Sequence, residues 1–297
     1  MTQRVAFIGM GVMGFPMAGH LQQKGFDVCV YNRTAAVAKR WCETYSGNAA
    51  ATPKQAAEGA DIVFVCVGND EDVRSVVYGE QGALSGMKAG AILVDHTTAS
   101  AELARELELA CKERGVGFMD APVSGGQAGA ENGVLTVMIG GEERLLEKVK
   151  PALDCYAKYV GWQGPAGSGQ LAKMVNQICI AGVVQGLAEG MQFIERAGLD
   201  AERVIQAISQ GAAGSWQMAN RWKTMADGSY EFGFAVDWMR KDLQLTLEEA
   251  NRNGSRLPLT AMIDQFYGDV QAKGGSRWDT SSLLTRFIEP KSESKKA

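Results

Sequence analysis

The stretch Arg4-Val5-Ala6-Phe7-Ile8-Gly9-Met10-Gly11-Val12-Met13-Gly14 is a short apolar run followed by glycines in the pattern Gly-x-Gly-x-x-Gly. Residues 17–21 then have the apolar spacing of a helix, which reaches Gly25, and residues 26–31 form a second apolar run. This order predicts a strand, a glycine-rich turn, a helix and a second strand. It is the βαβ setting that a dinucleotide-binding turn requires.

Each glycine of the turn has a predicted physical role. Gly9 allows the tight turn, Gly11 lets the backbone approach a pyrophosphate, and Gly14 lets helix and strand pack closely. The start of the helix adds free N–H groups and a favourable dipole for the phosphate charge. We therefore predict that the cofactor contacts the turn through Gly9, Met10, Gly11, Val12, Met13 and Gly14.

The end of the second predicted strand bears on the choice of cofactor. An acidic residue at this place would bind a free adenosine ribose. The chain instead has Asn32, Arg33 and Thr34, and an arginine can pair with a 2'-phosphate in a bidentate manner. The residues therefore favour NADP. NAD stays open, because an asparagine can also hydrogen-bond a free ribose.

Strands and helices continue to alternate along the first half of the chain. Strands are predicted at 62–67, 91–95, 116–120 and 134–139, and helices at 35–45, 56–58, 101–114 and 142–156. This alternation predicts a parallel sheet with helices on both faces, whose ligand lies at the carboxyl ends of the strands.

The residues that follow three of these strands are distinctive, namely 68–70, 96–98 and 121–126. In the last segment Pro122 stiffens the backbone and Ser124 presents a hydroxyl group. Gly125 and Gly126 leave backbone N–H groups free to bind a small carboxylate. An ordinary glycine-rich connection is the alternative.

Glycines crowd residues 161–169, after which strand patterns largely disappear. A long apolar helix is predicted at 170–197, with Gly182, Gly186 and Gly190 spaced for close helix packing. Further helices are predicted at 201–210, 215–225, 236–253, 258–272 and 280–287. The predicted fold is an α/β Rossmann domain (1–164) joined by a long interdomain helix to an all-α substrate and oligomerisation domain (165–290), with a disordered tail (291–297).

Composition excludes several classes of protein. The 297 residues include 30 basic and 34 acidic ones and lack a long basic run before the tail, which argues against nucleic acid as the main partner. The sequence contains no uninterrupted run of about 18 or more apolar residues, so no membrane span is predicted. Six scattered cysteines without a Cys-x-x-Cys pair fit a reducing cytoplasm. His20 and His96 have no metal-ligand spacing, so neither a metal site nor a histidine triad is predicted.

Lysine is then the more interesting acid/base candidate. Gly169, Lys173 and Asn176 are four and three residues apart, so they share one face of the long helix. Spacing alone leaves Lys173 open between a surface cation and a catalyst. The pair Lys241-Asp242 is likewise open between a surface ion pair and a functional role.

These segments together resemble the β-hydroxyacid dehydrogenase family, which includes 3-hydroxyisobutyrate dehydrogenases, tartronate semialdehyde and glyoxylate reductases and related serine dehydrogenases. The resemblance covers nearly the whole chain. It rests on four motifs in the family's order: Gly9-x-Gly11-x-x-Gly14, residues 120–126 (Asp-Ala-Pro-Val-Ser-Gly-Gly), Gly169-x-x-x-Lys173-x-x-x-Gln177 with Asn176, and Lys241-Asp242-Leu243.

The resemblance implies that Lys173 is the catalytic acid/base. Free lysine has a pKa of about 10.4, so a base working near neutrality needs a pKa lowered by burial or by a neighbouring cation. The implied substrate contacts are Ser124, Gly125, Gly126, Asn176 and Asp242. The implied cofactor contacts beyond the turn are Thr98 on the nicotinamide side, the loop residues Val67 and Gly68, and Lys241, which closes over the cofactor. Many relatives have Leu-Pro where this chain has Val67-Gly68, which weakens the transfer at that loop.

The resemblance implies an NAD(P)-dependent dehydrogenase of a small 3-hydroxy acid such as 3-hydroxyisobutyrate, L-serine or glycerate. The motifs do not distinguish among these acids. An imine reductase and a non-catalytic dinucleotide-binding module are the alternatives. The presence of Lys173 counts against the first, and Lys173, Asn176 and Ser124 together count against the second. The family also implies a homodimer or homotetramer.

Overall fold

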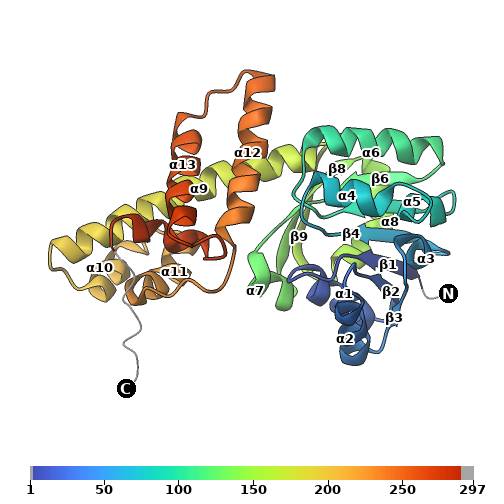
Figure 1. Cartoon of the computed structure of the whole chain (residues 1–297), viewed down its shortest axis with the longest axis horizontal. Coiled ribbons are helices and arrows are strands. Elements are labelled where there is room, and N and C mark those ends of the chain that lie inside the picture. The colour runs from blue at the N-terminus through green and yellow to red at the C-terminus, as the bar shows by residue number, and fades with distance from the viewer. Residues whose placement is uncertain (1–2, 289–297) are drawn as a thin grey trace. The chain divides into compact units, whose positions relative to one another are not determined.

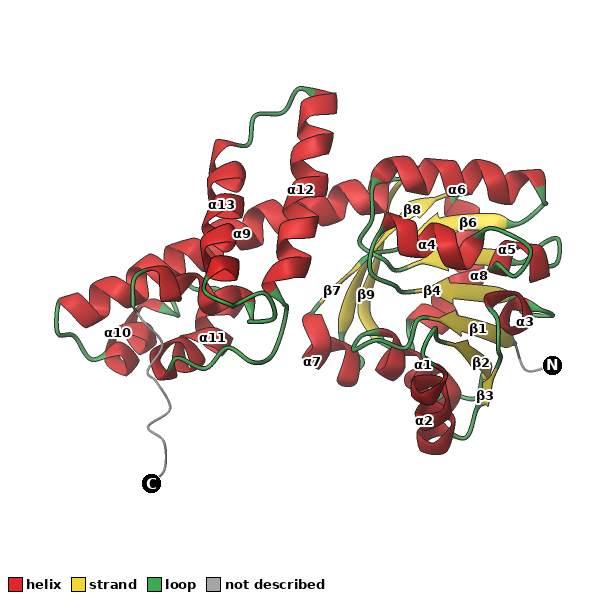
Figure 2. Ribbon diagram, in the orientation of Figure 1, coloured by secondary structure: helices red, strands yellow, loops and turns green. Residues whose placement is uncertain are grey.

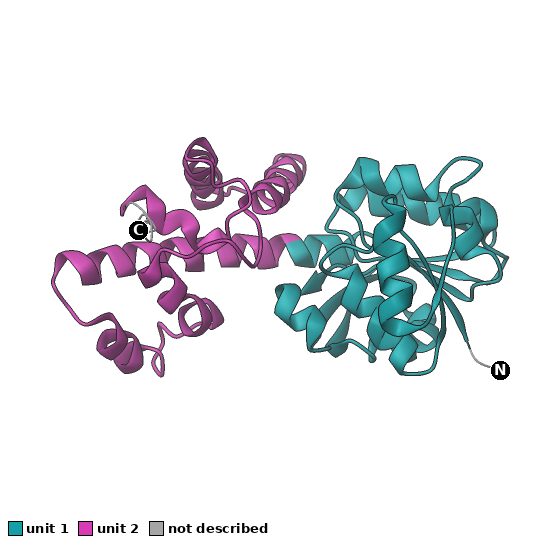
Figure 3. Cartoon of the chain, turned by 60° about the horizontal axis from the view of Figure 1, so that its bottom comes forward, with its two compact units in different colours: residues 1–173 teal, residues 174–297 magenta. Residues whose placement is uncertain are grey.

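The structure is a computed structural model and describes residues 3–288 (Figure 1). The chain divides into two compact units, Met1–Lys173 and Met174–Ala297 (Figure 3). This division falls inside one long helix, whereas the boundary that we predicted at residue 164 falls before that helix begins. The predicted tail of residues 291–297 lies outside the described residues.

The first unit contains a nine-stranded sheet in which the order β3-β2-β1-β4-β5-β6 is that of a Rossmann fold. The predicted fold class is therefore confirmed. The strands are β1 (Arg4–Ile8), β2 (Asp27–Tyr31), β3 (Asn48–Ala49), β4 (Ile62–Val65), β5 (Ile92–Asp95), β6 (Gly117–Asp120), β7 (Val123–Ser124), β8 (Leu135–Gly141) and β9 (Ala157–Gly164).

Helices cover both faces of this sheet (Figure 2). They are α1 (Gly14–Gln23), α2 (Ala35–Tyr45), α3 (Pro53–Ala57), α4 (Asp70–Val77), α5 (Ala83–Gly86), α6 (Ala101–Glu113), α7 (Gly126–Glu131) and α8 (Glu143–Leu153). Alternate residues of β1 belong to two hydrophobic clusters: Val5 and Phe7 pack with α1, α2 and α8, and Ala6 and Ile8 pack with α3 to α6. Burial on both faces explains why these strands are continuous apolar runs.

The sheet differs from the predicted parallel arrangement at one edge. Strand β8 runs antiparallel to β6 and β7, and β9 then runs parallel to β8. Between β6 and β8 the chain turns back through β7 and the six-residue α7, in place of the long crossover helix that joins parallel neighbours. Strand β9 was not predicted, because Gly161 and Gly164 weaken its strand pattern.

The long helix α9 (Ser168–Arg196) has 29 residues and is apolar enough to cross a membrane by length and composition. In the structure 44% of its most apolar window is buried. Ala181, Val184 and Leu187 on this helix lie in the hydrophobic core of the second unit, so α9 packs as a core helix.

The other described elements of the second unit are all helices, as predicted. They are α10 (Ala201–Ile208), α11 (Trp216–Asp227), α12 (Val236–Asn253), α13 (Pro258–Ala272) and the 3-10 helix η1 (Thr280–Arg286). The ranges of α12 and α13 are the predicted ones. Asp279 begins η1, and its buried carboxylate accepts hydrogen bonds from Ser281 N and Phe234 N. It also pairs with Arg221 at 3.1 Å.

Candidate active site

The loops that carry the predicted site residues leave one edge of the sheet. Ile8 is in register with Tyr31 and with Val65, Val65 with Asp95, and Asp95 with Asp120. All five are the last residues of parallel strands. The turns that follow them therefore emerge side by side, at the edge where Rossmann folds bind their ligand.

The glycine-rich turn needs glycine for two distinct reasons. Gly9 has a φ of +100°, and a Cβ there would lie 2.1 Å from the carbonyl oxygen of Cys66. A Cβ on Gly14 would lie 1.9 Å from the carbonyl oxygen of Gly9. A Cβ on Gly11 would meet no described atom within 4 Å. The chain itself thus requires glycine at 9 and 14, whereas Gly11 presents open backbone, as a phosphate-binding turn needs.

The other turn residues differ in exposure. Met10 is buried, Met13 is half-buried, and Val12 is exposed at the surface beside Gly11.

Asn32 braces this turn against the end of β2. Its side-chain oxygen accepts a hydrogen bond from Met10 N at 3.0 Å, and its amide nitrogen donates to Thr34 O at 3.1 Å. Arg33 is exposed, and its Nη1 lies 3.6 Å from the carboxylate of Asp72. A guanidinium is therefore held beside the glycine-rich turn. Its predicted contact with a 2'-phosphate stays a prediction.

The loops after β4 and β5 are joined by Thr97. Its hydroxyl accepts a hydrogen bond from Val67 N at 3.1 Å, and its own N–H donates to the Asp95 carboxylate at 2.9 Å. The half-buried Gly68 and Thr98 are the next residues along the two loops. The structure thus brings the predicted cofactor residues Val67 and Thr98 to neighbouring loops.

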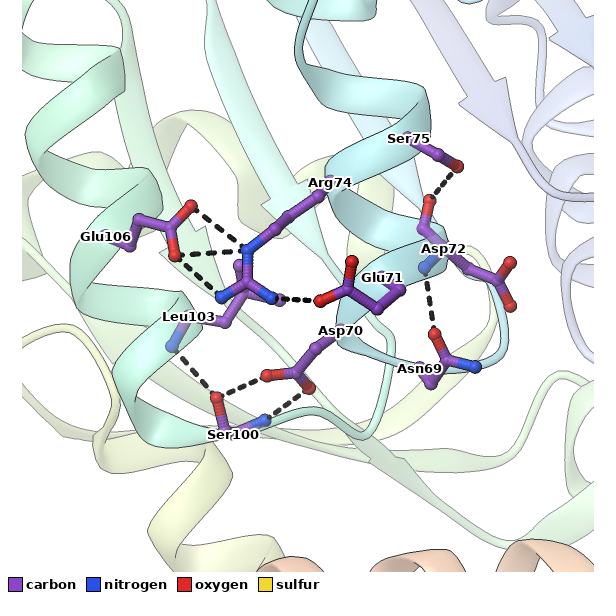
Figure 4. A network of polar contacts seen from close by, with 9 residues as sticks. All are labelled: Asn69, Asp70, Glu71, Asp72, Arg74, Ser75, Ser100, Leu103 and Glu106. Carbon is purple, nitrogen blue, oxygen red and sulfur yellow. Dashed lines mark hydrogen bonds and ion pairs between the residues drawn. The ribbon is translucent and has the colours of Figure 1, made fainter.

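A polar network between α4 and α6 joins the same two loops (Figure 4). Asp70 at the start of α4 accepts hydrogen bonds from the N–H and hydroxyl of Ser100, which caps α6. Arg74 of α4 pairs with Glu106 of α6 at 2.7 Å. Asp70 was noticed in the sequence only as part of a strand end, because its partner is 30 residues away.

The start of α9 is bound to this edge by Asp120. This fully buried carboxylate accepts hydrogen bonds from Gly167 N at 2.8 Å and from Gln170 N at 2.9 Å. Burial raises the pKa of Asp120, and these backbone N–H groups counteract part of that rise. Lys173 lies one turn further along α9, and this residue is only 7% exposed.

The predicted carboxylate-binding segment combines one strand and a helix start. Ser124 lies in β7, paired with Thr136 of β8. Gly125 has a φ of +131° and Gly126 a φ of +61°, and both are exposed. These left-handed conformations favour glycine and leave the backbone open at the start of α7.

In the second unit, Gln177 and Asp242 join α9 to α12. Gln177 Nε2 donates to Asp242 Oδ2 at 2.6 Å, and Asn176 Nδ2 donates to Gln177 Oε1 at 2.8 Å. The other oxygen of Asp242 lies 3.0 Å from Lys241 Nζ. The four predicted motif residues therefore form one chain of contacts, in which the buried Asp242 orients its neighbours. Their contacts with substrate and cofactor stay predictions.

His96 lies in the core beneath this edge. Its Nδ1 is 2.6 Å from Ala121 O and its Nε2 is 2.8 Å from the hydroxyl of Tyr156. A carbonyl only accepts, so Nδ1 carries the hydrogen and Nε2 accepts from Tyr156. Burial lowers the pKa of His96 to about 4, and burial raises the pKa of the adjacent Asp95 to about 7.

The shifted pKa values of His96 and Asp95 should have opposite effects on how stability depends on pH. An unfolded histidine binds a proton below 6.5, so the contribution of His96 is full above pH 6.5 and is lost as the pH falls through about 4. An unfolded aspartate has a pKa of 3.8. The contribution of Asp95 to stability is therefore full below pH 3.8 and is lost as the pH rises through about 7.

On acidification from about pH 6.5 to about pH 4, we therefore expect His96→Gln to gain about 3 kcal/mol of stability relative to the wild type. Asp95→Asn should lose stability relative to the wild type over the same range. Urea unfolding at both pH values measures these changes, with the nearby Asp120 common to all three proteins. If the stability of all three proteins depended on pH in the same way, the lowered pKa of His96 and the raised pKa of Asp95 would be contradicted.

Comparisons with known proteins extend these observations. Residues 4–164 match the family model described as the NAD binding domain of 6-phosphogluconate dehydrogenase. Residues 167–287 match the model described as NAD-binding of NADP-dependent 3-hydroxyisobutyrate dehydrogenase. The chain is 63% identical to an oxidoreductase of Shewanella frigidimarina, over 97% of this chain and 99% of that protein.

A second relative, the 2-hydroxy-3-oxopropionate reductase of Escherichia coli, is 33% identical over 95% of this chain and 96% of its own length. Among solved structures, Mycobacterium tuberculosis 3-hydroxyisobutyrate dehydrogenase with L-serine is 27% identical, with a TM-score of 0.85. That match covers 97% of this chain and all of the other.

Proposed function

Because the chain belongs to the β-hydroxyacid dehydrogenase family and is thereby an NAD(P)-dependent hydroxyacid dehydrogenase, we propose that it acts on a small 3-hydroxy acid with Lys173 as its general acid/base. The substrate class is that of 3-hydroxyisobutyrate, L-serine and glycerate. The single observation that carries the proposal is a buried lysine one helical turn after the helix start that Asp120 binds to the carboxyl edge of the sheet.

The residues around that edge suit a bound dinucleotide. Gly11 offers backbone with no described atom within 4 Å of a Cβ position, and the start of α1 follows it. The bound nicotinamide supplies the hydride chemistry. The chain's own part is to hold the acid and to move its hydroxyl proton.

Lys173 is the group proposed to move that proton. In oxidation its neutral amine takes the hydroxyl proton, and in reduction its ammonium returns it. Ser124 and the exposed backbone of Gly125 and Gly126 are proposed to hold the substrate carboxylate. Asn176, three residues after Lys173 on the same helix, is proposed to hold the substrate as well.

We propose NADP as the preferred cofactor. Arg33 supports this preference, because its side chain is 87% exposed beside the turn that Asn32 braces. A guanidinium suits a phosphate better than a free ribose hydroxyl. Asp72, 3.6 Å from Arg33, can hold the guanidinium in place until a phosphate competes for it.

We also propose a cytoplasmic homo-oligomer, either a dimer or a tetramer. All six cysteines are free thiols, as a reducing compartment favours. On α9, Val183 and Phe193 are exposed apolar residues. Cβ positions on Gly186 and Gly190 meet no atom of residues 3–288 within 4 Å. A Cβ on Gly182, by contrast, would lie 3.5 Å from Leu259 Cδ2 of α13. Among the described residues nothing packs closely against Gly186 and Gly190, and we propose that a second copy of the chain packs there.

A panel of substrates tests the proposed function. Purified protein is mixed with NADP or NAD and with 3-hydroxyisobutyrate, L-serine, glycerate, a 2-hydroxy acid or an amine, and the absorbance of reduced nicotinamide is followed. We expect turnover of at least one 3-hydroxy acid, with a higher kcat/KM for NADP than for NAD. Turnover confined to 2-hydroxy acids or to amines would reject the proposed substrate class.

A further inference from the structure

The loop between β5 and α6 is fixed on both sides of one residue, Thr98. On one side, Thr97 N donates to the Asp95 carboxylate at 2.9 Å. On the other, Ser100 N donates to the Asp70 carboxylate at 2.9 Å. Thr98 lies at the centre of this loop and is the predicted contact on the nicotinamide side.

A side chain from α9 completes the fixation of this loop. Gln170 Oε1 accepts a hydrogen bond from Ala99 N at 3.1 Å, and Gln170 Nε2 donates to Thr97 O at 2.8 Å. The two backbone groups flank Thr98, and the glutamine is only 1% exposed. A buried backbone group without a partner costs about 1–3 kcal/mol, so an apolar side chain could not replace this amide without loss.

The same residue belongs to the turn of α9 that precedes the lysine. Gln170 N donates to Asp120, and Lys173 follows three residues later, about 4.5 Å further along the helix axis. One side chain thus connects the loop around Thr98 to the helix that carries Lys173. Asp120 holds only the backbone of the helix start, and a different side chain at 170 would leave that contact in place.

We propose that Gln170 is a positioning residue for hydride transfer: its amide holds the Thr97–Ala99 loop and the Lys173 helix in one fixed geometry. The nicotinamide side of the cofactor and the lysine amine then meet adjacent atoms of the same substrate, its carbon and its hydroxyl. This inference rests on the proposed function, and it needs no contact between Gln170 and either ligand.

Gln170→Met tests the inference, because methionine has a similar length and makes neither hydrogen bond. Its matched control is Gln185→Met on the same helix, where the buried amide donates to Glu189 of that helix at 2.7 Å. We expect Gln170→Met to lower kcat about 10- to 100-fold with cofactor Kd and substrate KM little changed, since small misplacements of reacting groups have large effects on rate. A kcat equal to that of Gln185→Met would overturn the inference.

Gln170→Glu is a second variant with a more specific readout. A neutral carboxyl group can accept from Ala99 N and donate to Thr97 O, whereas a carboxylate can only accept. We therefore expect its kcat, divided by that of the wild type at each pH, to rise as the pH is lowered. A ratio that stays constant with pH would contradict the role of the two hydrogen bonds, and this variant also serves if Gln170→Met fails to fold.

Hydrogen exchange at the Ala99 amide tests whether Gln170 holds the Thr97–Ala99 loop, and it needs no turnover. Faster exchange in Gln170→Met than in Gln185→Met supports it, and equal exchange overturns it whatever the activities are. Failure of the proposed function would look different: the wild type would turn over no 3-hydroxy acid, or Lys173 variants would keep the wild-type kcat. The exchange result would still decide whether Gln170 holds the loop.

Discussion

Replacing Lys173 with alanine is expected to lower kcat by about 100- to 10,000-fold while the Kd of NADP changes little. The reason is that a positioned acid/base contributes this much to proton transfer, whereas the predicted cofactor residues lie on the loops after β1, β2, β4 and β5 and on α12. Steady-state kinetics with the best acid of the panel give kcat, and fluorescence titration of the reduced cofactor gives Kd.

Two controls separate loss of the proton carrier from loss of the fold. Lys150→Ala removes an exposed lysine of α8 that pairs with Asp154, and its kcat should match the wild type. Small primary amines added to Lys173→Ala should restore part of the rate, because they can occupy the space of the missing side chain. A Lys173→Ala protein that turns over like Lys150→Ala would reject the acid/base assignment.

The glycine-rich turn yields the second large effect, as a contrast between two alanine variants. A Cβ at Gly14 would lie 1.9 Å from Gly9 O, so Gly14→Ala forces backbone to move and should lose at least about 2 kcal/mol of stability. Gly11→Ala meets no described atom within 4 Å, so the free protein should melt within about 1 °C of the wild type. Its NADP affinity should still fall by about tenfold or more, because the added methyl group occupies the path of the pyrophosphate.

Thermal unfolding without cofactor and titration with NADP measure the two effects separately. The pattern to look for is a stability loss confined to Gly14→Ala and an affinity loss in Gly11→Ala without a stability loss. Wild-type NADP affinity in a stable Gly11→Ala protein would mean that the cofactor does not approach the turn at this position.

The parts of the fold that local patterns determine were predictable. Continuous apolar runs and the glycines after β1 predicted the buried parallel strands, and helical periodicity predicted α12 and α13 with the bounds that the structure has. The family resemblance is confirmed by the two family models that match residues 4–164 and 167–287. Its first motif was readable because the backbone requires glycine at 9 and 14.

The parts that depend on distant contacts were not predictable. Strand β9 is hidden by Gly161 and Gly164, and the antiparallel direction of β8 depends on its pairing with β6 and β7. Similarly, Gln170 looks like an ordinary helix residue until the partners of its amide, Thr97 and Ala99, are known, since they lie more than 70 residues away. Periodicity carries no information about such partners.

Lys173 has both a predictable part, its place on the helix, and a part that depends on distant contacts. Spacing placed it on one helix face with Gly169 and Asn176, and the resemblance implied its role. The structure adds that Asp120 and Gln170 bind the start of that helix to the carboxyl edge of the sheet, and that the lysine is buried.

We propose that this chain oxidises a small 3-hydroxy acid with Lys173 taking the hydroxyl proton. A single-turnover experiment tests it most directly: wild-type and Lys173→Ala enzymes, each saturated with NADP and the acid, are followed by the absorbance of reduced nicotinamide. We expect the wild type to reduce its bound cofactor at least about 100-fold faster than the variant. Equal rates of reduction in the two proteins would contradict it.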